Sequence, residues 1–159
     1  MESVYVETSV ISYLTSCPSR DLVAAAHQQV TLDWWERKRH GFELFISELV
    51  LDEVRAGDPD AARRRLALVD ELGRIAISPE VVRFARRLVE KLAIPRAAEV
   101  DAFHVAVATV NGMDYLLTWN CRHIASARVA RLVRAEATAV GYEAPIICTP
   151  EELLGEDYV

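Results

Sequence analysis

The chain has 159 residues, of which 52% are hydrophobic and 26% charged, an ordinary mixture for one globular domain, expected here to span residues 1–159. The formal net charge of −6 argues against a protein that grips nucleic acid over a broad surface, but permits a nuclease with a small acidic metal site. The apolar runs are too short to span a bilayer, the N-terminus is not expected to be a signal peptide, and three cysteines without CxxC spacing favour a reducing cytoplasm over disulfides or zinc.

Five short apolar runs predict β-strands, at residues 4–6, 42–46, about 75–77, 115–118 and 146–148. Helical spacing of apolar residues predicts helices at 22–39, 48–55, 60–72, 80–92, 99–110, 126–140 and 151–154. Strands that alternate with helices indicate βαβ units and therefore a mainly parallel sheet covered on both faces. The expected fold is an α/β fold, a three-layer α/β/α sandwich, with a largely helical excursion between residues 48 and 92.

Glu7 directly follows the first predicted strand, so it is expected at the carboxyl edge of the sheet, where open α/β folds build ligand sites. An acid at this position is equally typical of a helix N-cap. The next two residues, Thr8 and Ser9, are either turn residues or hydroxyl groups that orient a carboxylate or a bound water.

Glu53 is the acid of the predicted helix 48–55 with a reason to face inward, because it flanks the apolar stripe formed by Leu49 and Val54. Glu48 lies in the first turn and Asp52 points towards solvent. We therefore expect these last two to be capping or solvated acids.

Asp101 lies near the start of an otherwise apolar helix, which leaves little room for a solvent-facing side. Because an ionised carboxylate on a buried helix is costly without compensation, a functional site is the favoured interpretation, with helix capping as the alternative. His104, one turn further on, is more typical of a hydrogen-bonded core histidine than of a metal ligand, since no second histidine follows at the spacing of a zinc motif.

Asn120 leaves the strand at 115–118 at its carboxyl end, as Glu7 leaves the first strand. Its amide could bind a metal or an acid, or it could be a routine turn residue. Arg122 and His123 follow it and could meet an anionic substrate. The sequence contains neither a glycine-rich phosphate loop nor a GxSxG motif, which excludes the corresponding nucleotide-binding and hydrolase classes.

The remaining candidates, Glu7, Glu53, Asp101 and Asn120, all offer oxygen atoms. Oxygen donors are the ligands that Mg²⁺ and Mn²⁺ prefer. A metal held in this way can activate water and neutralise charge that develops on a phosphate. The pattern therefore indicates phosphodiester hydrolysis.

Four segments of the chain, taken together, match a known family: YVETSVISYL at 5–14, FISELVLDEV at 45–54, EVDAFHVAVATVNGMDYLLTWNCRHI at 99–124 and ICTPEELL at 147–154. They resemble the PIN-domain family, in particular the VapC-like toxins of bacterial toxin–antitoxin pairs. The resemblance implies a Rossmann-like sandwich and an endoribonuclease whose Mg²⁺ or Mn²⁺ is bound by a cluster of acids. It further implies an RNA substrate, homodimers and a small antitoxin that blocks the site.

Carried over by position, the family's three acids fall on Glu7, Glu53 and Asp101, and its fourth polar position falls on Asn120. The family usually has aspartate where this chain has Glu7, and often has an acid where it has Asn120. These two departures keep a second hypothesis open, a catalytically weak or inactive PIN-like module that binds RNA or a protein partner. A structure-specific DNA nuclease of the same fold is the third hypothesis.

Overall fold

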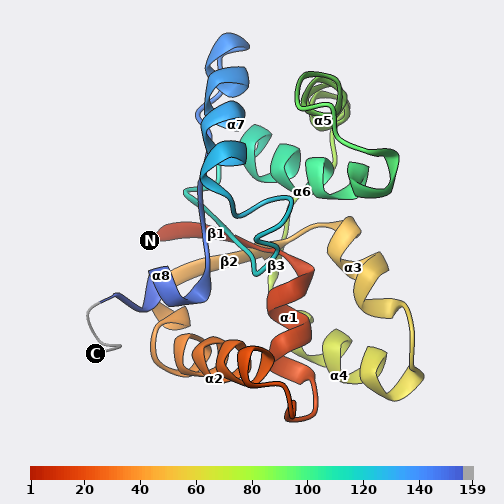
Figure 1. Ribbon diagram of the computed structural model, residues 1–159, viewed down its shortest axis with the longest axis vertical. Coiled ribbons are helices and arrows are strands. Elements are labelled where there is room, and N and C mark those ends of the chain that lie inside the picture. Colours follow the sequence, from red (N-terminus) through yellow and green to blue (C-terminus); the bar gives the residue numbers. More distant parts are fainter. Residues whose placement is uncertain (156–159) are drawn as a thin grey trace.

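Five parallel strands in the order β3-β2-β1-β4-β5 form the centre of the computed structural model, which describes residues 1–155 (Figure 1). The last four residues of the expected domain 1–159 lie outside the described part. The strands are β1 (Glu2–Val6), β2 (Phe42–Ile46), β3 (Gly73–Arg74), β4 (Tyr115–Leu117) and β5 (Ile146–Cys148). The predicted α/β sandwich with a mainly parallel sheet is therefore confirmed.

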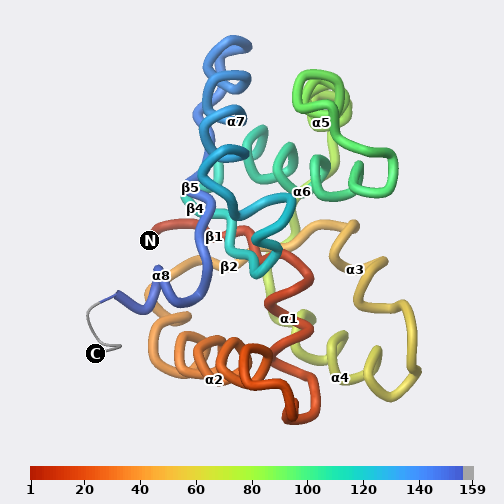
Figure 2. Tube along the Cα trace, in the orientation of Figure 1, coloured from red at the N-terminus to blue at the C-terminus, as the bar shows by residue number. Residues whose placement is uncertain are grey.

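Helices cover both faces of this sheet, as Figures 1 and 2 show. One layer contains α5 (Pro79–Lys91), α6 (Glu99–Val110) and α7 (Ala127–Ala139), and the opposite layer contains α1 (Thr8–Thr15), α2 (Leu22–Arg37) and α8 (Pro150–Leu154). Two further helices, α3 (Glu48–Arg55) and α4 (Pro59–Val69), pack against each other and beside α1. None of the helices in residues 1–155 is both long and apolar enough to cross a membrane.

The buried parts of the central strands are apolar because both of their faces are covered. Val4, Tyr5 and Val6 of β1 are fully buried, as are Leu116 and Leu117 of β4. The register pairs Val6 with Leu117. The residue that follows β1 and the residue that follows β4 therefore emerge side by side at the carboxyl edge of the sheet.

Several boundaries differ from the sequence-based expectation, and three of the differences are informative. Helix α1 starts immediately after Glu7, in a segment rich in β-branched residues that had no predicted helix bounds. Strand β3 is Gly73–Arg74 instead of 75–77, because it pairs with the last two residues of β2; beyond it, Ile75 still donates one ladder bond to Ile46. Helix α2 ends at Arg37, before a 3₁₀ turn at Arg39–Gly41.

Candidate functional site

Glu7 caps helix α1 and faces the carboxyl edge of the sheet at the same time. Its Oε2 accepts hydrogen bonds from the backbone N–H of Ser9 at 3.2 Å and from Thr118 Oγ1 at 2.7 Å. The side chain is 5% exposed. In the described chain these bonds, and a further one from the Ser9 hydroxyl, all reach Oε2, so Oε1 is left with its lone pairs available. Both interpretations of Glu7, cap and site acid, are compatible with this geometry.

Glu53 extends from α3 towards Glu7, as expected for the inward-facing acid of that helix. Its Oε1 accepts a hydrogen bond from Thr8 Oγ1 at 2.9 Å and lies 2.6 Å from Nε2 of His104. Partial burial acts to raise the pKa of Glu53, but the hydrogen bonds that its carboxylate accepts from His104 and from the Thr8 hydroxyl act in the opposite direction, and this pKa lies below its ordinary value. Glu53 is therefore an ionised acceptor at neutral pH.

The two other acids of α3 behave as expected for surface residues. Glu48 and Asp52 are exposed, and both pair with the Arg55 guanidinium, at 3.2 and 3.3 Å respectively. Within the described residues, neither side chain forms a hydrogen bond or ion pair with Glu7 or Glu53. The same helix therefore supplies one site acid and a neighbouring acid that can serve as a matched control.

Asp101 and Asn120 form a pair beside this cluster. Asn120 donates from Nδ2 to Asp101 Oδ1 at 3.1 Å, while its amide oxygen accepts the backbone N–H of His123 at 3.0 Å. The backbone N–H of Asn120 donates to Thr118 Oγ1 at 2.9 Å, and that hydroxyl bonds Glu7. Asn120 is thus both a turn residue and the group that holds Asp101.

The donor atoms of this region fit a divalent cation. One ligand atom each from Glu7, Glu53 and His104 lie within 4.8 Å of one another, a group of which Asp101 is not a member in the described chain. Within residues 1–155, no Lys or Arg nitrogen lies within 4.0 Å of a carboxylate oxygen of Glu7, Glu53 or Asp101. Neighbouring carboxylates without a protein cation repel each other, and a bound metal ion would remove that repulsion.

His104 is the site residue that the sequence alone did not identify. As expected for a core histidine, it is fully buried and hydrogen-bonded, but its Nε2 bonds the proposed site acid Glu53, and its Nδ1 lies 2.8 Å from the Tyr5 hydroxyl. The sequence feature that could have identified it is that His104 is a polar residue three positions after Asp101 in an otherwise apolar helix. That spacing places both residues on the same side of α6.

A basic pocket of about 230 Å³ adjoins Asp101. Its walls include Arg122, His123 and Arg128, which follow β4 or begin α7. In the described part of the chain, neither Arg122 nor Arg128 has a carboxylate partner within 4.0 Å. The charge of its walls suits an anionic group next to the acids, and Arg122 and His123 lie where such a group would meet them.

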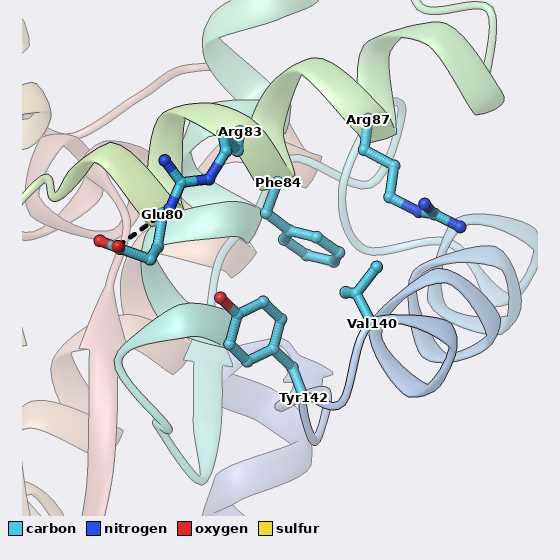
Figure 3. Close-up of a pocket in the computed structure, with 6 residues that line it drawn as sticks. All are labelled: Glu80, Arg83, Phe84, Arg87, Val140 and Tyr142. Atoms are coloured by element: carbon cyan, nitrogen blue, oxygen red, sulfur yellow. Dashed lines mark hydrogen bonds and ion pairs between the residues drawn. The ribbon is translucent and has the colours of Figure 1, made fainter.

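A second pocket, of about 280 Å³, lies between α5 and the end of α7 (Figure 3). Its two arginines already have partners, because Arg83 pairs with Glu80 at 2.9 Å and Arg87 with Glu136 at 2.6 Å. The Phe84 ring packs edge-on against a tyrosine at its base. None of the predicted site residues lines this pocket, so we assign it to helix packing.

Comparison with known proteins agrees with this architecture. No curated protein sequence matches the chain significantly. The structure is similar to that of VapBC2 from Rickettsia felis bound to a DNA fragment from its promoter, with a TM-score of 0.60 and 14% identity over 92% of this chain and 97% of the other. It is also similar to VapBC-1 from nontypeable Haemophilus influenzae, with a TM-score of 0.55 and 12% identity over the same shares.

A sequence model of the PIN domain matches residues 4–128, which include all four predicted site positions. PIN domains are generally nucleases. The match covers well over half of the 159 residues. The chain therefore belongs to the PIN domain family.

Proposed function

We propose that this protein is a Mg²⁺- or Mn²⁺-dependent endoribonuclease that acts as the toxin of a type II toxin–antitoxin pair. The observation that carries the proposal is the group of acids at the carboxyl edge of the sheet. Glu7 and Glu53 approach within 4.8 Å, and Asp101 is joined to Glu7 through Asn120 and Thr118. Three acids without an Arg or Lys partner in the described chain, beside a pocket with two unpaired arginines, suit a cation and a phosphate together.

Each acid has a defined role in this proposal. Glu7, Glu53 and Asp101 would hold the ion through carboxylate oxygens, and Asn120 would keep Asp101 in place through its 3.1 Å bond. A bound Mg²⁺ or Mn²⁺ would activate water and stabilise the negative charge that develops on the phosphate. The Thr118 hydroxyl orients Glu7 and the Thr8 hydroxyl orients Glu53, so that each acid keeps one oxygen free of protein bonds in the described chain.

The basic pocket supports a phosphodiester as the substrate class. Guanidinium groups bind phosphate through paired, charge-assisted hydrogen bonds. Arg122 and Arg128 would contact a phosphate next to the scissile one while the acids contact the scissile group itself. This pocket is a small basic site, whereas the whole chain has a net charge of −6. This combination favours contact with single-stranded RNA at one small basic site over binding along a broad surface.

The direct test is cleavage of single-stranded RNA by the purified protein with Mg²⁺ or Mn²⁺. Cleavage should stop in chelator and in Asp101→Asn, and should continue in Asp52→Asn, which removes a surface acid from the helix that carries Glu53. Cleavage that persists in chelator or in Asp101→Asn would overturn the proposal. Competition between RNA and DNA of the same sequence separates a ribonuclease from a DNA nuclease of this fold.

One observation favours the competing function, a non-catalytic module that binds RNA or a protein. Asn120 brings no charge to the fourth position, and its amide oxygen is already bonded to the His123 N–H. Mn²⁺ titration discriminates between the two, because a weakened site would show no binding at millimolar metal. Binding that is lost in Glu53→Gln supports the enzyme.

A small antitoxin and a second copy of this chain are the proposed protein partners, in the cytoplasm. The similar solved structures are described as VapBC assemblies, and we transfer a partner of that kind to this chain as part of the proposal. A short upstream reading frame with a DNA-binding motif should relieve growth arrest when it is co-expressed. Light scattering of the purified protein should give the mass of a dimer. A monomer at micromolar concentration would contradict the proposed homodimer.

A further inference from the structure

A buried row of polar side chains reaches Glu53 from the interior of the protein. Ser47 Oγ lies 2.7 Å from the Tyr5 hydroxyl, which lies 2.8 Å from Nδ1 of His104; Nε2 of His104 then lies 2.6 Å from Glu53 Oε1. Ser47 is 1% exposed, and Tyr5 and His104 are fully buried. Burying three polar side chains is costly unless every one is hydrogen-bonded, and here each one is.

The three inner residues come from different elements that the fold brings together. Tyr5 is in β1 and His104 is in α6. Ser47 follows β2 and occupies the N-cap position of α3, but its side chain makes no capping hydrogen bond there. The row therefore joins β1, the residue that follows β2, and α6 to Glu53 of α3. A polar connection of this length through an apolar core requires a reason beyond packing, since apolar residues of similar volume would pack without the desolvation cost.

The chemistry of the two ends fixes the direction of the hydrogen bonds. The Tyr5 hydroxyl carries one proton that it can donate, and a carboxylate such as that of Glu53 can only accept. A neutral imidazole carries one N–H, and it satisfies both neighbours when Tyr5 donates to Nδ1 and Nε2–H donates to Glu53. Ser47 then donates to Tyr5.

The other arrangements place the ring protons differently. With the proton on Nδ1, the Nε2 lone pair would face a carboxylate oxygen at 2.6 Å, with no hydrogen between two acceptors. A doubly protonated ring would donate from both nitrogens, so Tyr5 could no longer donate to Nδ1. Both alternatives give nitrogen signals that differ from those of the neutral Nε2–H form.

We propose that His104 is a positioning residue for metal binding, held in its Nε2–H tautomer by Tyr5 and Ser47 so that it fixes Glu53 Oε1 and leaves Oε2 for the ion. This inference rests on the proposed metal site. Glu53 needs such a restraint because a long, partly exposed side chain otherwise samples several rotamers, and ordering it costs free energy. In this assignment His104 is not itself a ligand, since the nitrogen that faces the acids carries the proton.

Nitrogen-15 NMR of the metal-free protein tests the tautomer without any reference to activity. Wild-type protein should show the neutral Nε2–H pattern for His104. Tyr5→Phe removes the donor to Nδ1 while the ring is retained, and should convert that pattern into a mixture of tautomers. An Nδ1–H or doubly protonated ring in the wild type, or an unchanged pattern in Tyr5→Phe, would overturn the assignment.

Mn²⁺ affinity, measured by calorimetry, tests the positioning role. His104→Leu should raise the Kd for Mn²⁺ by roughly 10- to 100-fold, the usual effect of removing a group that orients a metal ligand. His104→Gln keeps an N–H donor near the position of Nε2 and should restore most of the affinity. Thr109→Val is the control. It removes a buried hydroxyl from the same helix, and in the described part of the chain this hydroxyl bonds only Val105 O, at 2.8 Å, so the Kd should stay unchanged.

The outcomes separate this inference from the proposed function. If Glu53→Gln also leaves Mn²⁺ binding unchanged, the metal site is wrong, whatever the tautomer. If Glu53→Gln abolishes binding but His104→Leu does not weaken it, the metal site stands and the positioning role fails. If added Mg²⁺ removes the Nε2 proton, and His104→Gln does not restore affinity, His104 is a ligand and the inference is overturned.

Discussion

Thr118 Oγ1 donates a 2.7 Å hydrogen bond to Glu7 Oε2 and accepts a 2.9 Å bond from the Asn120 backbone N–H. One hydroxyl group therefore connects the end of β1 with the turn that holds Asp101. Thr118 is fully buried, so neither bond can be replaced by water without rearrangement. The acids of the site are fixed relative to each other by neutral side chains of the sheet edge.

Thr118→Val should destabilise the protein and weaken metal binding together. The substitution leaves a carboxylate oxygen and an N–H with one partner fewer, which costs about 1–3 kcal/mol of unfolding free energy. Urea unfolding measures the loss and Mn²⁺ titration measures the affinity. Thr109→Val, whose hydroxyl bonds its own helix, should lower stability without a change in affinity. Equal Mn²⁺ affinity in Thr118→Val and wild type would contradict the role of this residue.

Arg122→Gln and Arg128→Gln should weaken RNA binding without a change in Mn²⁺ affinity. Both arginines line the basic pocket beside Asp101, and each phosphate contact that is lost should reduce the slope of log affinity against log salt by about 0.7 for a single strand. The expected kinetic signature is a raised KM with kcat nearly unchanged. Arg83→Gln, in the pocket of Figure 3 where Arg83 pairs with Glu80, should leave both the KM and the salt slope as in wild type. A fall in kcat alone would place these residues outside substrate binding.

Asp114 gives a pH-dependent contribution to stability at the opposite edge of the sheet. Its Oδ2 accepts from the backbone N–H and the hydroxyl of Ser3, at 2.7 and 2.8 Å, and these two bonds hold the pKa of Asp114 below its ordinary value. A carboxyl with a lowered pKa in the folded state stabilises that state above its unfolded pKa, and the contribution disappears as pH falls through the folded value. The difference in unfolding free energy between wild type and Asp114→Asn should therefore be constant near neutral pH and shrink below about pH 4. A difference that stays constant down to pH 2 would show that ionisation of Asp114 does not matter.

Local sequence patterns were sufficient to predict most of the helices and strands, because the spacing of apolar residues and the composition of a segment are properties of that one element. The strand at 42–46 and the helix at 48–55 have the bounds expected from apolar spacing alone. The inward turn of Glu53 followed in the same way from its place beside the apolar stripe. Strand β3 was misplaced by two residues because its position depends on the end of β2, which is information that a local pattern does not contain.

A site residue could be predicted from the sequence when it directly follows a strand. A contact between two side chains that are far apart in the sequence could not be predicted in this way. Glu7 and Asn120 could be placed at the sheet edge from their positions after strands. The contact between Tyr5 and His104 joins residues 99 positions apart, and it depends on how α6 lies across the sheet. Tyr5 looked like an ordinary strand residue, so its hydroxyl gave no local indication of a partner.

Gly73→Ala should destabilise the edge of the sheet through a steric contact. A Cβ at this position would lie 2.6 Å from Cδ1 and 2.8 Å from Cε1 of the Phe45 ring, so the ring must move away from β3. Overpacking of this kind costs about 1–3 kcal/mol, which exceeds the stabilisation of about 0.4–1 kcal/mol that an alanine gains from reduced freedom of the unfolded chain. Gly41→Ala is the matched control, because nothing lies within 4 Å of its added Cβ, and it should be neutral or slightly stabilising. Equal unfolding free energies for the two variants in urea would show that Phe45 moves without cost, and that the pairing of β2 with β3 tolerates a side chain at residue 73.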